Sequence, residues 1–87
     1  MVIPASLKIG GHTYRVIRRE MDGKCGETNY TTRTIAIDNE LNGSSEAVTL
    51  IHEAMHVMNS ELDHTLLESL SEQMFQFLSD NGLLNDG

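Results

Sequence analysis

The spacing of apolar residues along the chain changes about halfway. In the first half, apolar and polar side chains alternate in residues 7–9, 12–19 and 31–38, which are rich in β-branched residues. Alternation of this kind predicts strands with one buried face. The Gly-Gly pair at 10–11 predicts a tight turn between the first two strands, whereas the Gly-, Asp- and Asn-rich residues 21–29 predict a turn or an irregular crossing.

The second half of the chain has the spacing of helices. Apolar side chains first recur at steps of three and four residues at Val48, Ile51, Met55 and Met58. This spacing predicts one face of a helix. Ser44 or Ser45 is the expected N-cap, and we expect the helix to end near residues 59–60.

A second helix is predicted after a short connection at residues 61–64. Its apolar side is expected to consist of Leu67, Leu70, Met74, Phe77 and Leu78. Asp63 or Thr65 is the expected N-cap, and the pair Asn81-Gly82 is expected to end the helix. The order β-β-β-α-α predicts an α+β fold, with a small three-stranded antiparallel sheet followed by two helices, in a single domain of residues 1–87.

The first predicted helix carries the sequence His52-Glu53-Ala54-Met55-His56, the HExxH pattern. Two histidines four positions apart project from the same side of a helix, so both imidazoles can reach one tetrahedral Zn²⁺. Glu53 is placed to contact a water on the metal and to accept its proton as a general base. The alternative is a pair of core histidines satisfied by backbone or carboxylate partners.

A catalytic zinc site usually has three protein ligands and an open fourth position. His64, Glu68 and Glu72 are the candidates for the third ligand. His64 lies eight positions after His56, and a chain that leaves the first helix near residues 59–60 can fold back over this distance. An antiparallel helical hairpin would instead bring Glu68 opposite His56. The pair Glu68 and Glu72 is also what a solvated acidic face would contain.

Charge is divided unevenly along this chain of net charge −7: all six basic residues lie in the first 33 positions, and the remaining 54 positions hold ten acidic residues. This distribution disfavours binding of phosphate backbones by the second half, so no nucleic-acid partner is expected. The simplest interpretation is an acidic helical half that a basic strand half partly neutralises. The alternative is that acids around a metal site favour a cationic or neutral peptide.

Length and cysteine usage narrow the class of protein further. Eighty-seven residues are close to the lower limit for a domain that folds without help, so a bound metal can matter to its stability. The single cysteine, Cys25, excludes an internal disulfide and suits a reducing cytoplasm. No apolar run has the length of a membrane span and no signal peptide is visible. We therefore expect a cytoplasmic protein without a membrane partner.

Two tyrosines have the chemistry to assist catalysis. Tyr14 or Tyr30 could stabilise a tetrahedral intermediate by donating a hydrogen bond. A half-buried tyrosine of a strand is the simpler interpretation of both.

The chain resembles the phage-encoded minimal gluzincin-type metallopeptidases, distant relatives of the repressor-cleaving metallopeptidases of mobile elements. The resemblance rests on LIHEAMH after a strand ending in TIAID, followed at once by a helix carrying LLESLSEQMFQFLSDN. It spans nearly the whole chain, from KIGGHTYRV to FLSDNGLL. It implies zinc, a three-stranded sheet whose last strand borders the cleft, an active-site helix and a second helix that bears a ligand.

The resemblance also bears on the third ligand, which in that family is usually a Glu early in the second helix, followed six and seven positions later by an apolar and a small residue. Counted from His64, these positions are Leu70 and Ser71, whereas counting from Glu68 puts the large Phe75 at the small position. The resemblance thus implies His64 as ligand, a departure from the family's usual Glu. Glu68 would then orient a metal-bound histidine, as a carboxylate does in thermolysin-like gluzincins.

These features predict a zinc-dependent metallopeptidase of phage or prophage origin, with Zn²⁺ on His52, His56 and His64 and with Glu53 as general base. A peptide or protein substrate is expected to extend along residues 31–38 and to add to the free edge of that strand. The alternative is a catalytically weak or inactive protein-binding module that zinc stabilises, because a small domain gains folding energy from metal alone.

Overall fold

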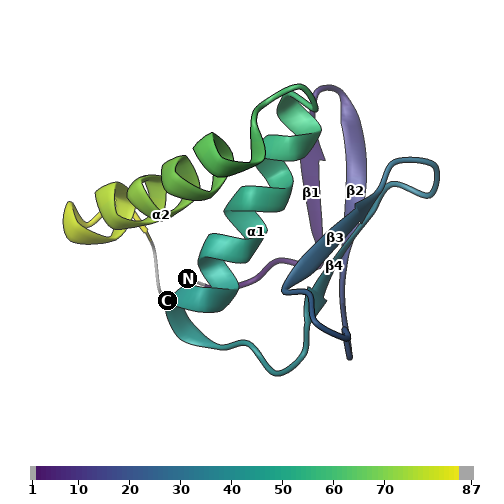
Figure 1. Cartoon of the computed structure of the whole chain (residues 1–87), viewed down its shortest axis with the longest axis horizontal. Coiled ribbons are helices and arrows are strands. Elements are labelled where there is room, and N and C mark those ends of the chain that lie inside the picture. Colours follow the sequence, from purple (N-terminus) through teal and green to yellow (C-terminus); the bar gives the residue numbers. More distant parts are fainter. Residues whose placement is uncertain (1, 85–87) are drawn as a thin grey trace.

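Four strands and two helices make up the fold in the computed structural model, which describes residues 2–84. The elements are β1 (Ser6–Ile9), β2 (His12–Arg19), β3 (Gly26–Asn29), β4 (Thr34–Asp38), α1 (Gly43–Met58) and α2 (His64–Asp80). Both helices lie on one side of the sheet (Figure 1), which confirms the predicted α+β class. Within residues 2–84, neither helix combines the length and the apolar character needed to cross a membrane.

The sheet is mixed and has the strand order β1-β2-β4-β3. β2 and β4 pair in parallel, whereas β1 pairs antiparallel with β2, and β3 antiparallel with β4. The predicted three-stranded antiparallel sheet is therefore wrong in detail. The missed strand, β3, lies in residues expected to form an irregular crossing. Because the chain reverses direction once before and once after β3, β4 returns parallel to β2.

The position of β4 inside the sheet corrects a second expectation. β4 has β2 on one side and β3 on the other, so the strand within residues 31–38 has no free edge for a substrate. Among the described residues, the free edge next to β4 belongs to β3. A peptide that extends the sheet at this end must therefore pair with β3.

The core lies between the sheet and α1. Alternation along β4 turns Ile35 and Ile37, both fully buried, toward Leu50 of α1, and Ile9 and Tyr14 join the same cluster. Burial of each large apolar side chain contributes about 1.5–3 kcal/mol. Tyr14 is thus a core residue, in line with the simpler of its two interpretations.

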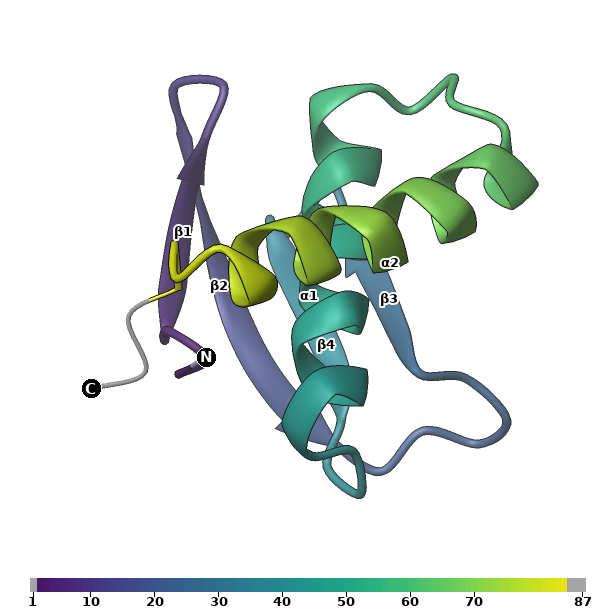
Figure 2. The same cartoon turned by 90° about the vertical axis from the view of Figure 1, so that its left-hand side faces the viewer.

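Helix α2 forms an outer layer that packs against α1 and, within residues 2–84, against no strand. Figure 2 shows α2 crossing in front of α1. Leu67 and Ser71 are the residues that α2 buries completely. The small Ser71 lets the helices approach closely, and its hydroxyl is satisfied because it donates to the backbone carbonyl of Leu67 at 2.7 Å.

The buried face of α2 is narrower than the apolar spacing indicates. Leu67 is buried and Leu78 partly buried, as expected, but Leu70, Met74 and Phe77 are 37%, 43% and 56% exposed. The helix has the predicted apolar side, but packing buries only the part of it that includes Leu67 and Leu78. A helix that contacts a single neighbour buries only the stripe that faces it, and the stripe here is centred on Leu67 and Ser71.

The N-cap of α2 is one of the two expected residues, whereas the N-cap of α1 is not. Asp63 is the N-cap of α2, and its carboxylate accepts a backbone N–H of the first turn at 3.1 Å. The predicted cap of α1 at Ser44 or Ser45 is wrong: the helix begins at Gly43, and its N-cap Asn42 makes no side-chain cap bond. Gly43 (φ +56°) turns the chain into the helix ahead of the serines.

Candidate metal centre and cleft

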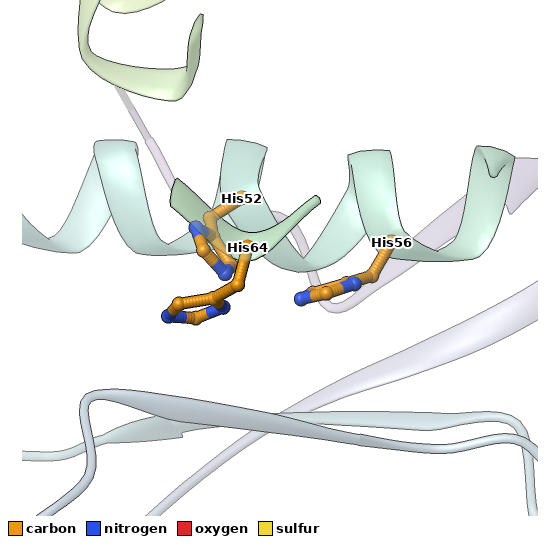
Figure 3. Close-up of side chains that lie close together, drawn as sticks. All are labelled: His52, His56 and His64. Carbon is orange, nitrogen blue, oxygen red and sulfur yellow. The ribbon is translucent and has the colours of Figure 1, made fainter. Parts of the chain in front are cut away.

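Three histidine side chains point toward one another where α1 meets α2 (Figure 3). His52 and His56 lie one turn apart on α1, and His64 is the first residue of α2. Ligand nitrogens of the three rings all lie within 4.8 Å of one another. The structure thus brings together the two histidines of HExxH and the third ligand that the resemblance implied.

The connection between the helices explains how His64 reaches this position. Asn59 ends α1 by donating its backbone N–H to a carbonyl of the last turn at 2.9 Å, and its side chain accepts the backbone N–H of Glu61 at 3.0 Å. Asp63 then caps α2, so that the new helix starts at His64 itself. The His64 ring lies 5.2 Å, centroid to centroid, from that of His52.

Glu68 contacts His64 and is not one of the converging ligands found among the described residues. Its Oε1 lies 3.2 Å from Nε2 of His64, one turn earlier on α2. A carboxylate that accepts a hydrogen bond from one imidazole nitrogen fixes the tautomer and leaves the other nitrogen for a metal. Both side chains are mostly exposed, so the contact orients the ring more than it stabilises the fold. Glu72 lines the cleft further along α2.

Glu53 is buried on α1 between His52 and the sheet, with 7% of its surface exposed. Its Oε1 accepts a hydrogen bond from Oγ1 of Thr28 in β3 at 2.6 Å. Hydrogen bonds to charged groups contribute about 1.5–3 kcal/mol. The edge strand therefore holds the carboxylate that the sequence assigns as general base.

Gly26 allows β3 to pass closely over α1. A Cβ at this position would lie 2.7 Å from Cγ2 of Thr49 and 3.2 Å from both Cγ of Glu53 and the carbonyl oxygen of Ala36. Cβ atoms in proteins essentially never approach another atom as closely as the first of these distances. The missing side chain is thus what lets Thr28 reach Glu53.

Replacing Gly26 by Ala is expected to destabilise the protein by about 1–3 kcal/mol, the usual cost of overpacking. The new methyl group must push β3 away from α1 or displace Thr49. Urea unfolding followed by circular dichroism measures the change. The double variant Gly26→Ala/Thr49→Ser removes the clashing Cγ2 and should recover much of the loss. Purely additive effects of the two substitutions would show that the contact is not the cause.

The ionisation of His52 suits metal binding. Burial lowers the pKa of His52, while the charge of Glu53 acts in the opposite direction. The lowered pKa favours the neutral imidazole, which is the form that coordinates metals. Three imidazole nitrogens without a cysteine, next to a buried carboxylate, fit the donor set of a catalytic zinc site better than that of a structural one.

Tyr30 follows β3 and lines the same cleft. Its hydroxyl donates to the backbone carbonyl of His56 at 3.1 Å, and this carbonyl belongs to the last turn of α1, which a helix leaves without internal donors. Burial raises the pKa of Tyr30, and the negative charge of Glu53 adds to the effect. The hydroxyl thus stays protonated and able to donate a hydrogen bond near the histidines.

These side chains line an open cleft of about 1020 Å³. Residues 23–26, Thr28 and Tyr30 form one wall, α1 forms the floor, and the first turns of α2 form the other wall. No pattern in the sequence alone marks Gly26 and Thr28 as site residues. Their signal is a small residue and a hydroxyl two positions apart, which in a strand share a face, but this signal is visible only once residues 26–29 are known to be a strand.

Comparisons with known proteins add no relative: no family model, no curated protein and no solved structure matches the chain.

Proposed function

We propose that this chain is a minimal zincin, a zinc-dependent metallopeptidase of phage or prophage origin that acts in the cytoplasm of a host bacterium. The proposal rests on one observation above all. Ligand nitrogens of His52, His56 and His64 lie within 4.8 Å of one another, next to the buried carboxylate of Glu53, in an open cleft along an edge strand. A catalytic site needs all three: a metal, a base and access.

The roles of the residues follow from their places. His52 and His56 from α1 and His64 from α2 would hold the ion, with Glu68 orienting the ring of His64. When bound, Zn²⁺ acts as a Lewis acid on the scissile carbonyl and lowers the pKa of the attacking water. Glu53 takes the proton of that water on a carboxylate oxygen and delivers it to the leaving amine. Thr28 keeps this carboxylate in place from the opposite wall.

The substrate peptide is proposed to lie extended along β3. The edge of this strand borders the cleft, and β4 has no free edge. Main-chain hydrogen bonds to an edge strand hold a peptide in an extended conformation, which exposes its carbonyl groups to the site. Tyr30, directly after β3, lines the same cleft, and its hydroxyl would donate to a developing oxyanion by exchanging its bond to the backbone carbonyl of His56 for one to the substrate.

A direct test is to incubate the zinc-loaded protein with a mixture of synthetic peptides and to identify products by mass spectrometry. We expect cleavage that a chelator stops and that added Zn²⁺ restores. Protein that binds zinc in a one-to-one ratio and cleaves no peptide or unfolded protein would overturn the proposed activity.

A second function, a zinc-stabilised binding module without catalysis, is favoured by the packing of α2. Because α1 is the one helix or strand of residues 2–84 that α2 packs against, a metal shared between the helices would hold α2 in place and stabilise the domain. Zinc-dependent folding without hydrolysis would support this function and exclude the first. The buried Glu53, which no binding module requires, supports the peptidase.

A further inference from the structure

β3 is a short strand at the edge of the sheet (Figure 2). Its four residues, GETN, include no large apolar side chain, and within residues 2–84 the strand packs against β4 and α1. An edge strand with few buried apolar contacts opens and shifts more readily than the strands inside a sheet. The exact position of β3 is therefore sensitive to what binds along its free edge.

The main-chain groups of β3 face its two sides alternately. The amide of Asp38 in β4 donates to the carbonyl oxygen of Cys25 at 2.8 Å, and in the register of β3 and β4 these two residues are opposite each other. Hydrogen-bonded and non-bonded pairs alternate along an antiparallel ladder. The main chain of Glu27 is therefore directed to β4, whereas the main-chain groups of Gly26 and Thr28 are directed to the free edge.

The side chain of Thr28 leaves the plane of the sheet toward α1. Its hydroxyl donates to Oε1 of the buried Glu53 at 2.6 Å, and among the described residues this is the hydrogen bond that the carboxylate accepts. The close approach of Gly26 to Thr49 leaves little space between β3 and α1. The orientation of the carboxylate therefore follows the position of Thr28.

We propose that Thr28 couples the docking of a peptide to the orientation of the general base. Its main chain pairs with the peptide and its hydroxyl holds Glu53, so that a peptide that fixes β3 also fixes the carboxylate. Thr28 is a positioning residue, because it acts through Glu53. This coupling rests on the proposed peptidase function and adds a substrate class to it, namely peptides long enough to pair with both Gly26 and Thr28.

The coupling uses binding energy from residues of the peptide that are remote from the scissile bond. Energy used in this way raises kcat and not only the affinity, so that truncated substrates lose kcat. A misplacement of about 1 Å near the reacting groups costs on the order of 10²-fold in rate. Peptides too short to pair with β3 should thus be cut with a kcat lower by about tenfold or more than longer peptides with the same scissile bond.

A first test needs no substrate. Amide hydrogen exchange of the zinc-loaded protein, followed residue by residue by NMR, should give higher protection factors for Glu27 and Asn29 than for Gly26 and Thr28, because only the first two amides bond to β4. Equal protection, or the reverse order, would overturn the coupling, since the main chain of Thr28 would not be free to pair with a peptide.

A second test compares Thr28→Val with Thr28→Ser in the full-length, zinc-loaded chain. The substrates are a peptide found by the mixture assay and versions of it shortened stepwise from each end. Valine keeps the branched shape and the main chain but lacks the hydroxyl. Thr28→Val should lower kcat on the longest peptide by about 10- to 100-fold with KM near that of the wild type, and kcat should no longer depend on peptide length. Thr28→Ser keeps the hydroxyl and should retain most of kcat and its length dependence.

The outcomes separate the coupling from the peptidase activity itself. Zinc content and circular dichroism of both variants should match the wild type, because Thr28 is not a proposed ligand. Wild-type kcat and length dependence in Thr28→Val, an equal loss in Thr28→Ser, or a change in KM alone would each overturn the coupling and leave the peptidase in place. A wild type that cleaves no peptide would contradict the proposed function and the coupling with it.

Discussion

Replacing Glu53 by Gln is expected to lower the rate of peptide cleavage by a factor on the order of 10²–10⁴, the usual contribution of a general base. Gln has nearly the same shape, and its carbonyl oxygen can still accept the hydrogen bond that Thr28 now donates to the carboxylate at 2.6 Å. Fold and zinc content should therefore remain as in the wild type. The measurement is kcat on a peptide found by the mixture assay, together with zinc determined by atomic absorption.

The matched control is Glu72→Gln, which neutralises another carboxylate of the same cleft. It should change the rate by far less, because Glu72 belongs to α2 and the hydroxyl of Thr28 donates to Glu53 instead. Full activity of Glu53→Gln would remove the assigned general base. A large loss in both variants would point to the charge of the cleft as the cause.

Removal of zinc is expected to loosen α2 before the rest of the molecule. A site saturated at about one hundred times its dissociation constant contributes about 2.7 kcal/mol to the free energy of unfolding. For a domain of this size, that loss lowers Tm by more than about 10 °C. Amide hydrogen exchange should show the largest loss of protection in α2. Within residues 2–84 this helix packs against one other element, α1, and the metal would link His64 to His52 and His56.

Single substitutions separate the roles of the residues near the third ligand position. His64→Ala should weaken zinc binding strongly and reproduce the loosening of α2 in the presence of zinc. Glu68→Ala should weaken binding by about 10- to 100-fold, as expected of a residue that orients a ligand, and Glu72→Ala should have little effect. If Glu68→Ala releases zinc as completely as His52→Ala does, and His64→Ala does not, Glu68 is the third ligand.

The sequence predicted the elements that carry strong periodic patterns. β2, β4 and both helices have alternating or helical spacing. Capping chemistry left the N-cap of α2 open between Asp63 and Thr65, and the structure has Asp63. β3 has neither pattern, because GETN contains no large apolar residue and a single β-branched one. It is a strand because β4 pairs with it, and such pairing depends on residues distant in sequence.

Part of the candidate site could be predicted from local spacing, and part depends on contacts between residues distant in sequence. HExxH determines the relative positions of His52, Glu53 and His56 through helical geometry alone, so this part needed no tertiary information. The convergence of His64 depends on how five residues connect the helices, and the resemblance supplied what spacing left open. The contacts of Thr28 and Tyr30 cross from the sheet to α1. These contacts could not be predicted while residues 26–29, which form β3, were taken for a turn.

The packing of α2 shows a second limit of prediction from sequence, which concerns the part of an apolar arc that becomes buried. Periodicity gave a wide apolar arc, and both Leu67 and Leu70 lie within it, but Leu67 is fully buried and Leu70 is 37% exposed. Which part of such an arc faces the core depends on how closely the neighbouring helix can approach. The small, fully buried Ser71 marks that line of approach, so a small residue between apolar ones was the more informative signal.

The shortness of β3 limits how tightly the protein could hold a chain. An edge of four residues presents outward-facing main-chain groups on alternate residues, enough for about four hydrogen bonds, each of which contributes about 0.5–1.5 kcal/mol. Such a gain barely exceeds the entropic cost of ordering a flexible peptide. An arbitrary unfolded chain would therefore dissociate before it was cut, and the same short edge offers little template for aggregation. A peptidase built on this strand would spare most of the proteins around it and depend on additional contacts to select its target.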